Sequence, residues 1–167
     1  MLAQIIKIRE FSTPRVNFYT IQFDGKKISE FADFHARLSV NEENNEELNE
    51  IFDTLDNIGK RGAFRKYFRE EDNAYALPPK DCCMISTYDY GIRLYCVVLS
   101  PRIVILMNGN RKKTQKALEE GSNVSKFFRQ ANSLHEALIK SKNCGEINWD
   151  DYSGLNYDDD YLVDVKG

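Results

Sequence analysis

A run of basic residues follows two apolar segments in the second half of this sequence. Between residues 102 and 116 five side chains are basic and none is acidic, and four of the five are Arg111, Lys112, Lys113 and Lys116. Cations at the end of a rigid strand can neutralise phosphates and stabilise the charge that develops when a phosphodiester is cleaved. A solvated loop leading into a helix is the simpler interpretation, although cations at a helix start oppose its dipole.

Two further groups of residues belong to the same hypothesis. Arg93 stands in an otherwise apolar run, so it either forms a structural ion pair or reaches the strand end with a functional role. Arg61, Arg65 and Tyr67 lie where basic and aromatic residues are interleaved, which suits phosphate contact and base stacking. We expect both groups to converge with residues 111–116 on one patch that binds a polyanion.

The charge distribution is consistent with such a patch. The net charge is −3. Residues 1–59 hold 6 basic and 11 acidic side chains, residues 60–142 hold 16 and 8, and residues 143–167 hold 1 and 7. A basic middle between two acidic ends indicates a polyanion-binding face, although an ordinary solvated surface gives the same count.

Metal and cofactor chemistry has little support in the sequence. The four cysteines (Cys82, Cys83, Cys96 and Cys144) form no C-x-x-C pair, and the two histidines leave too few ligands for a structural zinc site. No phosphate-binding glycine loop and no H-E-x-x-H motif is present. We therefore expect neither a metal nor a cofactor, and we expect His35 and His135 to pack at the edges of apolar helix faces.

The periodicity of apolar residues predicts which elements position these side chains. Strands are expected at 2–9, 16–23, 82–88, 92–99, 102–108 and 161–165, and helices at 29–38, 46–58 and 123–141, with a short helix ending near 120. Ser29 is expected to cap the first helix and Gly59 to end the second. Residues 60–80 are expected to form a loop with one helical turn.

Together these elements predict an α+β fold. A helical hairpin packs on an antiparallel β-meander, with a β-hairpin at the N-terminus and helices towards the C-terminus. Strands 92–99 and 102–108 are apolar on both faces and should be central. We expect one domain over residues 1–142 and an acidic tail over residues 143–167.

The order of these elements and three motifs resemble the RelE/HigB-type toxins of bacterial toxin–antitoxin systems, in particular the HigB-like branch. The motifs are Gly91-Ile92-Arg93-Leu94-Tyr95, the apolar run from Arg102 to Gly109, and Lys112-Lys113-Thr114-Gln115-Lys116. The resemblance covers about residues 16–142, and its most specific part is the K-K-T after the last strand. Residues 1–15 and 143–167 lie outside it.

The resemblance implies an endoribonuclease that cuts messenger RNA, usually on the ribosome, by metal-independent attack of a 2′-hydroxyl on the adjacent phosphate. Motif position assigns Arg93, Lys112 and Lys113 to catalysis, and Arg111 and Lys116 to phosphate contact. Arg61, Arg65 and Tyr67 are added from the residues alone. The implied partners are RNA or the ribosome and an antitoxin protein.

Several alternatives stay open from the sequence. One is a relative with the toxin fold that binds protein or RNA without catalysis, and another is an unrelated α+β domain that acts on a small molecule. A further hypothesis is that the acidic tail masks the basic middle of its own chain in place of a separate antitoxin. No apolar run approaches the roughly 20 residues of a membrane span, and no secretory signal is visible, so we expect a cytoplasmic protein.

Overall fold

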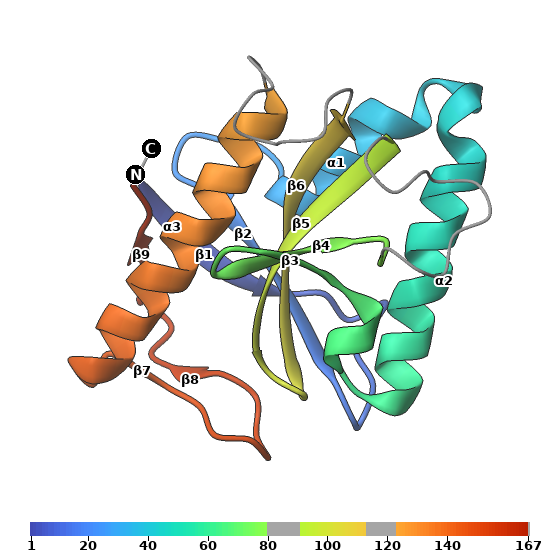
Figure 1. Cartoon of the computed structure of the whole chain (residues 1–167). Helices are drawn as coiled ribbons and strands as arrows, with labels where there is room; N and C mark the ends of the chain where they lie inside the picture. Colours follow the sequence, from blue (N-terminus) through green and yellow to red (C-terminus); the bar gives the residue numbers. More distant parts are fainter. Residues whose placement is uncertain (80–90, 113–122, 167) are drawn as a thin grey trace.

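The chain folds into three layers with a mixed sheet in the middle. The computed structural model describes residues 1–79, 91–112 and 123–166. Helices α1 (Glu30–Ser39) and α2 (Asn45–Arg61) cover one face of the sheet, and α3 (Asn123–Asn143) covers the other (Figure 1). The α+β class expected from the sequence is confirmed.

The large sheet has seven strands in the order β3-β4-β5-β6-β2-β1-β9. Their bounds are β1 Leu2–Lys7, β2 Asn17–Phe23, β3 Arg69–Glu71, β4 Ala74–Leu77, β5 Gly91–Ser100, β6 Ile103–Lys112 and β9 Val163–Asp164. Neighbouring strands are antiparallel except β2 and β6, which pair in parallel. Strands β7 (Ile147–Asn148) and β8 (Asn156–Tyr157) form a separate small hairpin. The strand expected at 82–88 and the short helix before 120 lie outside the described residues.

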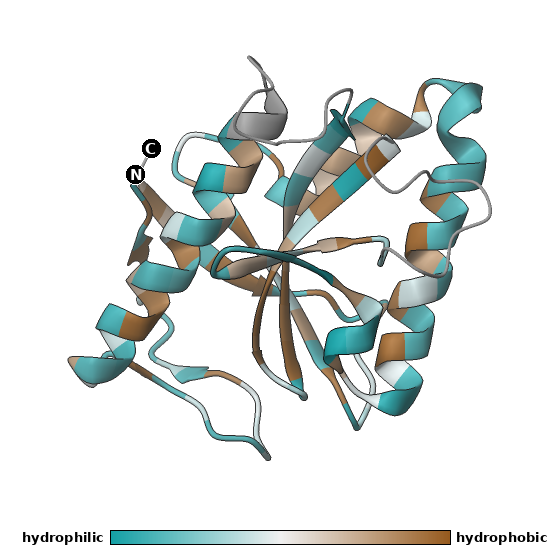
Figure 2. Ribbon diagram, in the orientation of Figure 1, coloured by the Kyte–Doolittle hydropathy of each residue, from teal (hydrophilic) through white to brown (hydrophobic). Residues whose placement is uncertain are grey.

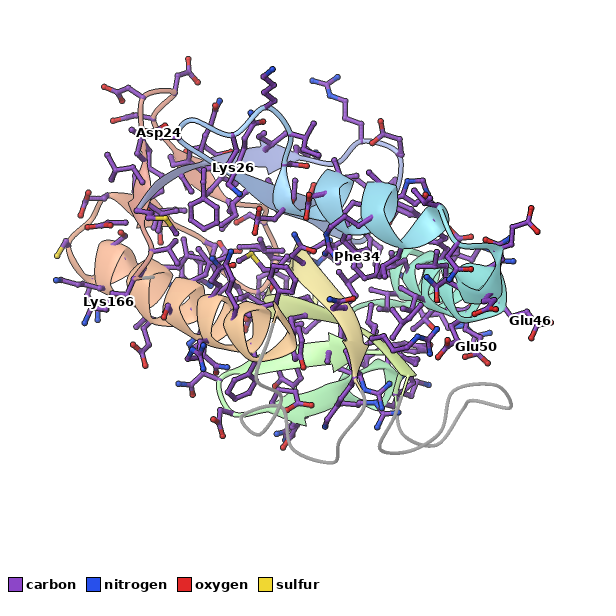
Figure 3. All side chains as sticks on the ribbon, turned by 90° about the horizontal axis from the view of Figure 1, so that it is seen from above. Asp24, Lys26, Phe34, Glu46, Glu50 and Lys166 are labelled. Carbon is purple, nitrogen blue, oxygen red and sulfur yellow. The ribbon has the colours of Figure 1, made fainter. Side chains whose placement is uncertain are left out.

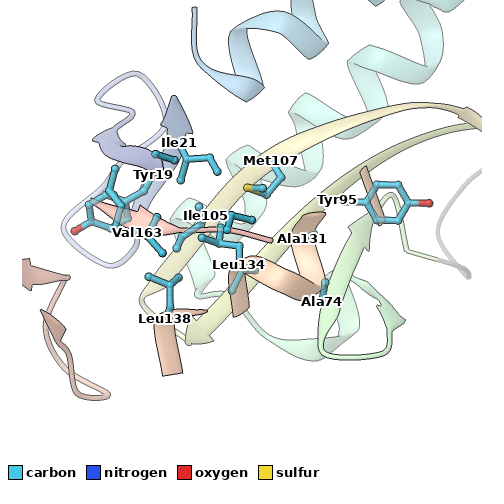
Figure 4. Packing of buried hydrophobic residues seen from close by; sticks show 14 of the residues in the cluster. Tyr19, Ile21, Ala74, Tyr95, Ile105, Met107, Ala131, Leu134, Leu138 and Val163 are labelled. Atoms are coloured by element: carbon cyan, nitrogen blue, oxygen red, sulfur yellow. The ribbon is translucent and has the colours of Figure 1, made fainter. Parts of the chain in front are cut away.

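Strands β5 and β6 occupy the centre because their side chains are apolar on both faces. Alternate residues enter two separate cores: Ile103 and Ile105 face α3, while Val104 and Leu106 face α1 and α2. Figure 2 shows the resulting apolar strands between helices whose outer faces are polar. In the core beneath α3, Ala131, Leu134 and Leu138 pack towards Ile105 and Met107 (Figure 4).

The helical hairpin forms much as its sequence indicates. Ser29 caps α1, because its Oγ accepts a hydrogen bond of 3.2 Å from the Ala32 amide. The end of α2 expected at Gly59 is wrong: the helix continues to Arg61 and ends at Gly62, whose φ is +114°. Gly59 is needed for a different reason, since a Cβ there would lie 3.0 Å from Thr13 Cγ2 in the loop that packs on the helix.

The segment 60–80 contains more structure than the sequence suggested. The expected helical turn is the short 3-10 helix Arg65–Tyr67. The β3–β4 hairpin follows it and was not expected. Asn132 of α3 holds the turn between these strands, because its Oδ1 accepts hydrogen bonds from the amides of Asn73 and Ala74 at 2.7 and 3.1 Å.

The acidic C-terminal segment packs into the core beneath α3. Strand β9 pairs with β1 through Leu2 and Ala3. Five of its apolar side chains are buried: Ile147, Trp149, Tyr161, Val163 and Val165. The Lys142 ammonium lies 4.2 Å from the centre of the Trp149 ring. The acidic residues between these anchors face solvent, so the tail combines an apolar inner side with a charged outer side.

Candidate site at the open end of the β5–β6 hairpin

The open end of the β5–β6 hairpin is where β5 begins, at Gly91, and β6 ends, at Lys112. Viewed from above, α1 and α3 lie on either side of these strand ends (Figure 3). Arg93 pairs with Asn110, and Lys112 pairs with Gly91. Because side chains two residues apart share a face of the sheet, Arg93 and Lys112 are diagonal neighbours on the face that α3 covers.

Arg93 is almost completely buried at this end, with 1% of its surface exposed. Its Nη1 donates a hydrogen bond of 3.1 Å to the carbonyl of Ile92. Burial lowers the pKa of Arg93 to about 10, helped by the nearby Arg69 and opposed by Tyr95, Glu71 and Glu47. The guanidinium therefore keeps its charge at neutral pH.

Arg69 is a second buried arginine on the same face. It pairs with Ala76, which in turn pairs with Tyr95 beside Arg93. Its Nε donates a hydrogen bond of 2.6 Å to the carbonyl of Pro78. With Lys112, which is also buried, the open end holds three cations on the α3 side of the sheet. Such a concentration of buried positive charge is unusual for a structural core.

An extra residue in β6 decides which side chains join this cluster. Leu94 pairs with Gly109 and Cys96 with Leu106, so two residues of β6, Met107 and Asn108, stand opposite one of β5, Tyr95. Gly109 sits at this bulge, and a Cβ there would lie 1.7 Å from the carbonyl oxygen of Arg93. The bulge therefore requires glycine, and it reverses the faces of the residues that follow.

Arg111 consequently points to the opposite side of the sheet. Its Nη2 lies 2.5 Å from Glu47 Oε2 and 2.6 Å from Asn44 Oδ1. The other oxygen of Glu47 accepts a hydrogen bond of 3.2 Å from the Ile92 amide. Arg111 thus joins the start of α2 to both central strands, and its guanidinium is engaged by protein groups.

The basic loop after α2 lies at the other end of the molecule. The Ala63 amide donates a hydrogen bond of 2.8 Å to the carbonyl of Pro101, in the turn between β5 and β6. Ten residues of strand span about 33 Å, so Arg61 lies far from the open end. Arg65 forms an ion pair with Glu70, and the Tyr67 ring lies 5.2 Å from the Lys66 ammonium.

The described residues therefore do not form the single convergent patch expected from the sequence. Arg93 and Lys112 come together, Arg111 lies on the opposite face, and Arg61, Arg65 and Tyr67 lie near the turn end. Lys113 and Lys116 lie outside the described residues. Sequence reasoning missed Arg69 in the cluster, because nothing local indicates that its segment forms a strand beside β4.

Helix α1 covers the part of the β6 edge that does not pair with β2. Asn108 Nδ2 donates to Asp33 Oδ2 at 2.8 Å, and Arg37 donates to Asn108 Oδ1 at 2.6 Å and to the Gly109 carbonyl at 2.8 Å. Asp33 and Arg37 also form an i,i+4 ion pair of 2.8 Å. This network fixes the bulge and, through it, the positions of Arg93 and Lys112.

Other site types find little support in the described part of the chain. Its acidic, cysteine and histidine side chains form no group of three or more that could hold a metal ion. Burial raises the pKa of the Cys96 thiol far above its ordinary value, which makes it unreactive. None of the helices described is long and apolar enough to cross a membrane. No family model, curated protein or solved structure matches this chain.

Proposed function

We propose that this chain is a RelE/HigB-like toxin that cleaves messenger RNA, on the ribosome and without a metal. The observation that carries the proposal is that Arg93 and Lys112 are diagonal neighbours on one face of the open end, directly before the sequence Lys113-Thr114-Gln115-Lys116. The α+β fold and the two apolar central strands are those that the resemblance implies. The resemblance itself rests on the sequence motifs.

In the proposed reaction the 2′-hydroxyl attacks the neighbouring phosphorus and loses its proton. The bond from phosphorus to the 5′-oxygen breaks, the leaving oxygen takes up a proton, and a cyclic phosphate remains. Lys112 and Lys113 contact the phosphate, and stabilise the negative charge of the transition state. Arg93 and Arg69 are positioning residues: they are buried on the same face of the sheet as Lys112 and add positive potential there.

A second candidate is a non-catalytic relative that binds RNA or protein. It is favoured by the structural roles of two of the cations. Arg93 is buried, and Arg111 is held by Glu47 and Asn44, so both contribute to the fold. In this alternative the cluster organises the strand ends and catalyses no reaction.

The test is cleavage of a messenger RNA on purified ribosomes, with growth arrest on expression as the cellular readout. The variant Lys112→Gln with Lys113→Gln is expected to reduce cleavage at least about 100-fold, the scale of losing charge stabilisation and proton transfer. Lys140→Gln with Lys166→Gln, on exposed positions of α3 and the tail, is the matched control and should cleave normally.

Each other result has a defined meaning. Wild-type protein that binds RNA but never cleaves it supports the second candidate. Cleavage that survives the double substitution contradicts the assignment of the lysines. Absence of both binding and cleavage overturns both candidates and leaves a domain with a small-molecule role.

A further inference from the structure

Three loops meet at the turn end of the β5–β6 hairpin, opposite the candidate site. Thr13 of the β1–β2 loop donates a hydrogen bond of 2.6 Å to the Gly59 carbonyl near the end of α2. The Ala63 amide donates to Pro101 in the β5–β6 turn, and the Asn17 amide donates to the Arg102 carbonyl at 2.7 Å. In Figure 1 these loops lie together at the lower edge of the molecule.

These loops carry a concentration of positive charge. Residues 57–69 hold five basic side chains and no acidic one. We define the turn-end basic surface by six cations that are at least partly exposed: Arg9, Arg15, Lys60, Arg61, Lys66 and Arg102. None of the six forms an ion pair within the described ranges 1–79, 91–112 and 126–166. No carboxylate of these ranges therefore holds one of the six in a direct ion pair.

An aromatic side chain lies among these cations. Phe64 is 47% exposed, and on these described loops it is the single exposed large apolar residue. Its ring packs against Gly62, where a Cβ would lie 2.9 Å from the ring carbon Cε2. Gly62 therefore lets the backbone pack closely against one side of the Phe64 ring, while much of the ring stays exposed to solvent. A supported, exposed ring surrounded by cations is the arrangement on which unpaired bases stack.

We propose that the turn-end basic surface binds single-stranded RNA, with backbone phosphates on its cations and one base stacked on Phe64. The cations alone would accept any polyanion, but the aromatic ring favours a strand whose bases are unpaired. A membrane surface fits less well, because insertion needs several apolar anchors and these loops expose one. A hollow of about 400 Å³ beside Thr13, lined by Lys7 and Arg9, extends the surface towards β1. The proposal is independent of cleavage at the open end.

The experiment is fluorescence anisotropy of a labelled 12-nucleotide single-stranded RNA over a range of KCl concentrations. The logarithm of affinity is expected to fall with the logarithm of salt, by about 0.7 per phosphate contacted. Arg9→Glu with Arg15→Glu, both in the β1–β2 loop, and Lys66→Glu, in the 3-10 helix, should weaken binding at least about tenfold and make that slope shallower by about 2.

A matched control separates this surface from the net charge of the protein. Lys27→Glu with Lys140→Glu and Lys166→Glu makes the same change in net charge at exposed positions elsewhere, and should leave affinity within about twofold. If the control triple weakens binding as much as the turn-end triple, the proposal is overturned, because general electrostatics would explain the affinity.

The role of Phe64 has its own readout. Phe64→Leu keeps an apolar side chain but removes the aromatic face, and should weaken single-strand binding about fivefold or more while leaving duplex RNA binding unchanged. Phe64→Trp should restore single-strand binding. Equal binding of single-stranded and duplex RNA with no effect of Phe64→Leu overturns the proposal, as does preference for a polyglutamate peptide over RNA.

Failure of this proposal is distinguishable from failure of the proposed function. Cleavage on ribosomes tests the open end, whereas anisotropy of the free single strand with the turn-end triple tests the basic surface. A protein that never cleaves RNA but loses binding in the turn-end triple supports the basic surface. A protein that cleaves RNA while the turn-end triple binds normally contradicts it.

Discussion

Glu30 and Asp33 show how neighbouring carboxylates in one helix acquire different properties. Burial raises the pKa of Glu30, which is 6% exposed, and outweighs the attraction of Lys26 and Lys126. Partial burial also acts on Asp33, but hydrogen bonds from Asn108 and Arg37 prevail and lower its pKa. The ionised Asp33 therefore stabilises the hydrogen-bond network on β6, whereas ionisation of Glu30 lowers the stability of the folded protein.

Glu30→Gln is expected to stabilise the protein at neutral pH by about 1 kcal/mol, the scale of removing a buried charge. Since the folded-state pKa of Glu30 lies above its unfolded value, the folded protein holds this proton more tightly, and ionisation lowers stability as pH rises. The gain should therefore shrink as pH falls towards 4. Urea unfolding at several pH values measures it.

The matched control is Glu46→Gln, in the exposed first turn of α2, where no stabilisation is expected. A gain for Glu30→Gln that is equal at pH 4 and pH 7 would contradict the assigned role of its charge.

Individual site residues were partly predictable from sequence. Arg93 stood out because a charged residue interrupted an apolar run, and burial on the strand is what makes it unusual. The face of Arg111 was not predictable, because it depends on one extra residue near Gly109. A register shift of one residue moves every following side chain to the other face, and no local pattern in the sequence reports it.

At the scale of elements, α1 substitutes for a missing strand. Strand β2 pairs with β6 only from Ile103 to Ile105, so among the described residues the remaining edge of β6 has no strand neighbour on that side. Arg37 and Asp33 supply side-chain hydrogen bonds to Asn108 and the Gly109 carbonyl instead. Charged side chains that cover an edge also prevent it from pairing with another chain.

Arg37→Ala is expected to lower the free energy of unfolding by about 1–3 kcal/mol, because it removes the hydrogen bonds that Arg37 donates to the Gly109 carbonyl and to Asn108 Oδ1. Urea unfolding monitored by circular dichroism measures the loss. Arg61→Ala, at an exposed helix end with no ion pair in the described structure, should cost less than about 0.5 kcal/mol. Equal losses for the two variants would argue against the α1 network.

The elements that sequence predicted well are those with a strong local signal. The stripe of Leu48, Ile51 and Leu55 places α2, and the two apolar runs place β5 and β6. The β3–β4 hairpin was missed because Arg69-Glu70-Glu71 is polar, and it becomes a strand only by pairing with β4. The parallel pairing of β2 with β6 is equally non-local, since it joins segments about 85 residues apart.

At the scale of the whole molecule, the acidic tail is part of the core. Trp149→Ala is expected to cost about 3–5 kcal/mol, because it removes a large buried side chain beneath α3. Tyr152→Ala, at a position that is 83% exposed, should cost less than about 0.5 kcal/mol. Urea unfolding measures the free energy of unfolding of both variants. It is monitored by far-ultraviolet circular dichroism, because this signal does not depend on Trp149.

A loss below about 1 kcal/mol for Trp149→Ala would show that the tail is only loosely attached. Masking of the basic surfaces by the tail stays a prediction. It is best examined by neutralising the exposed Asp158, Asp159 and Asp160, because deletion of the tail also removes buried residues of the core.

The parallel pairing of β2 with β6 also determines when the sheet can form during translation. The ribosome makes β2 early, yet its partner emerges only after residue 103, and β9 joins β1 later still. Until then the nascent N-terminal hairpin exposes two unsatisfied edges and an uncovered apolar face. A polypeptide truncated before β6 therefore has no sheet to complete, and we expect chaperones to hold it and proteases to remove it.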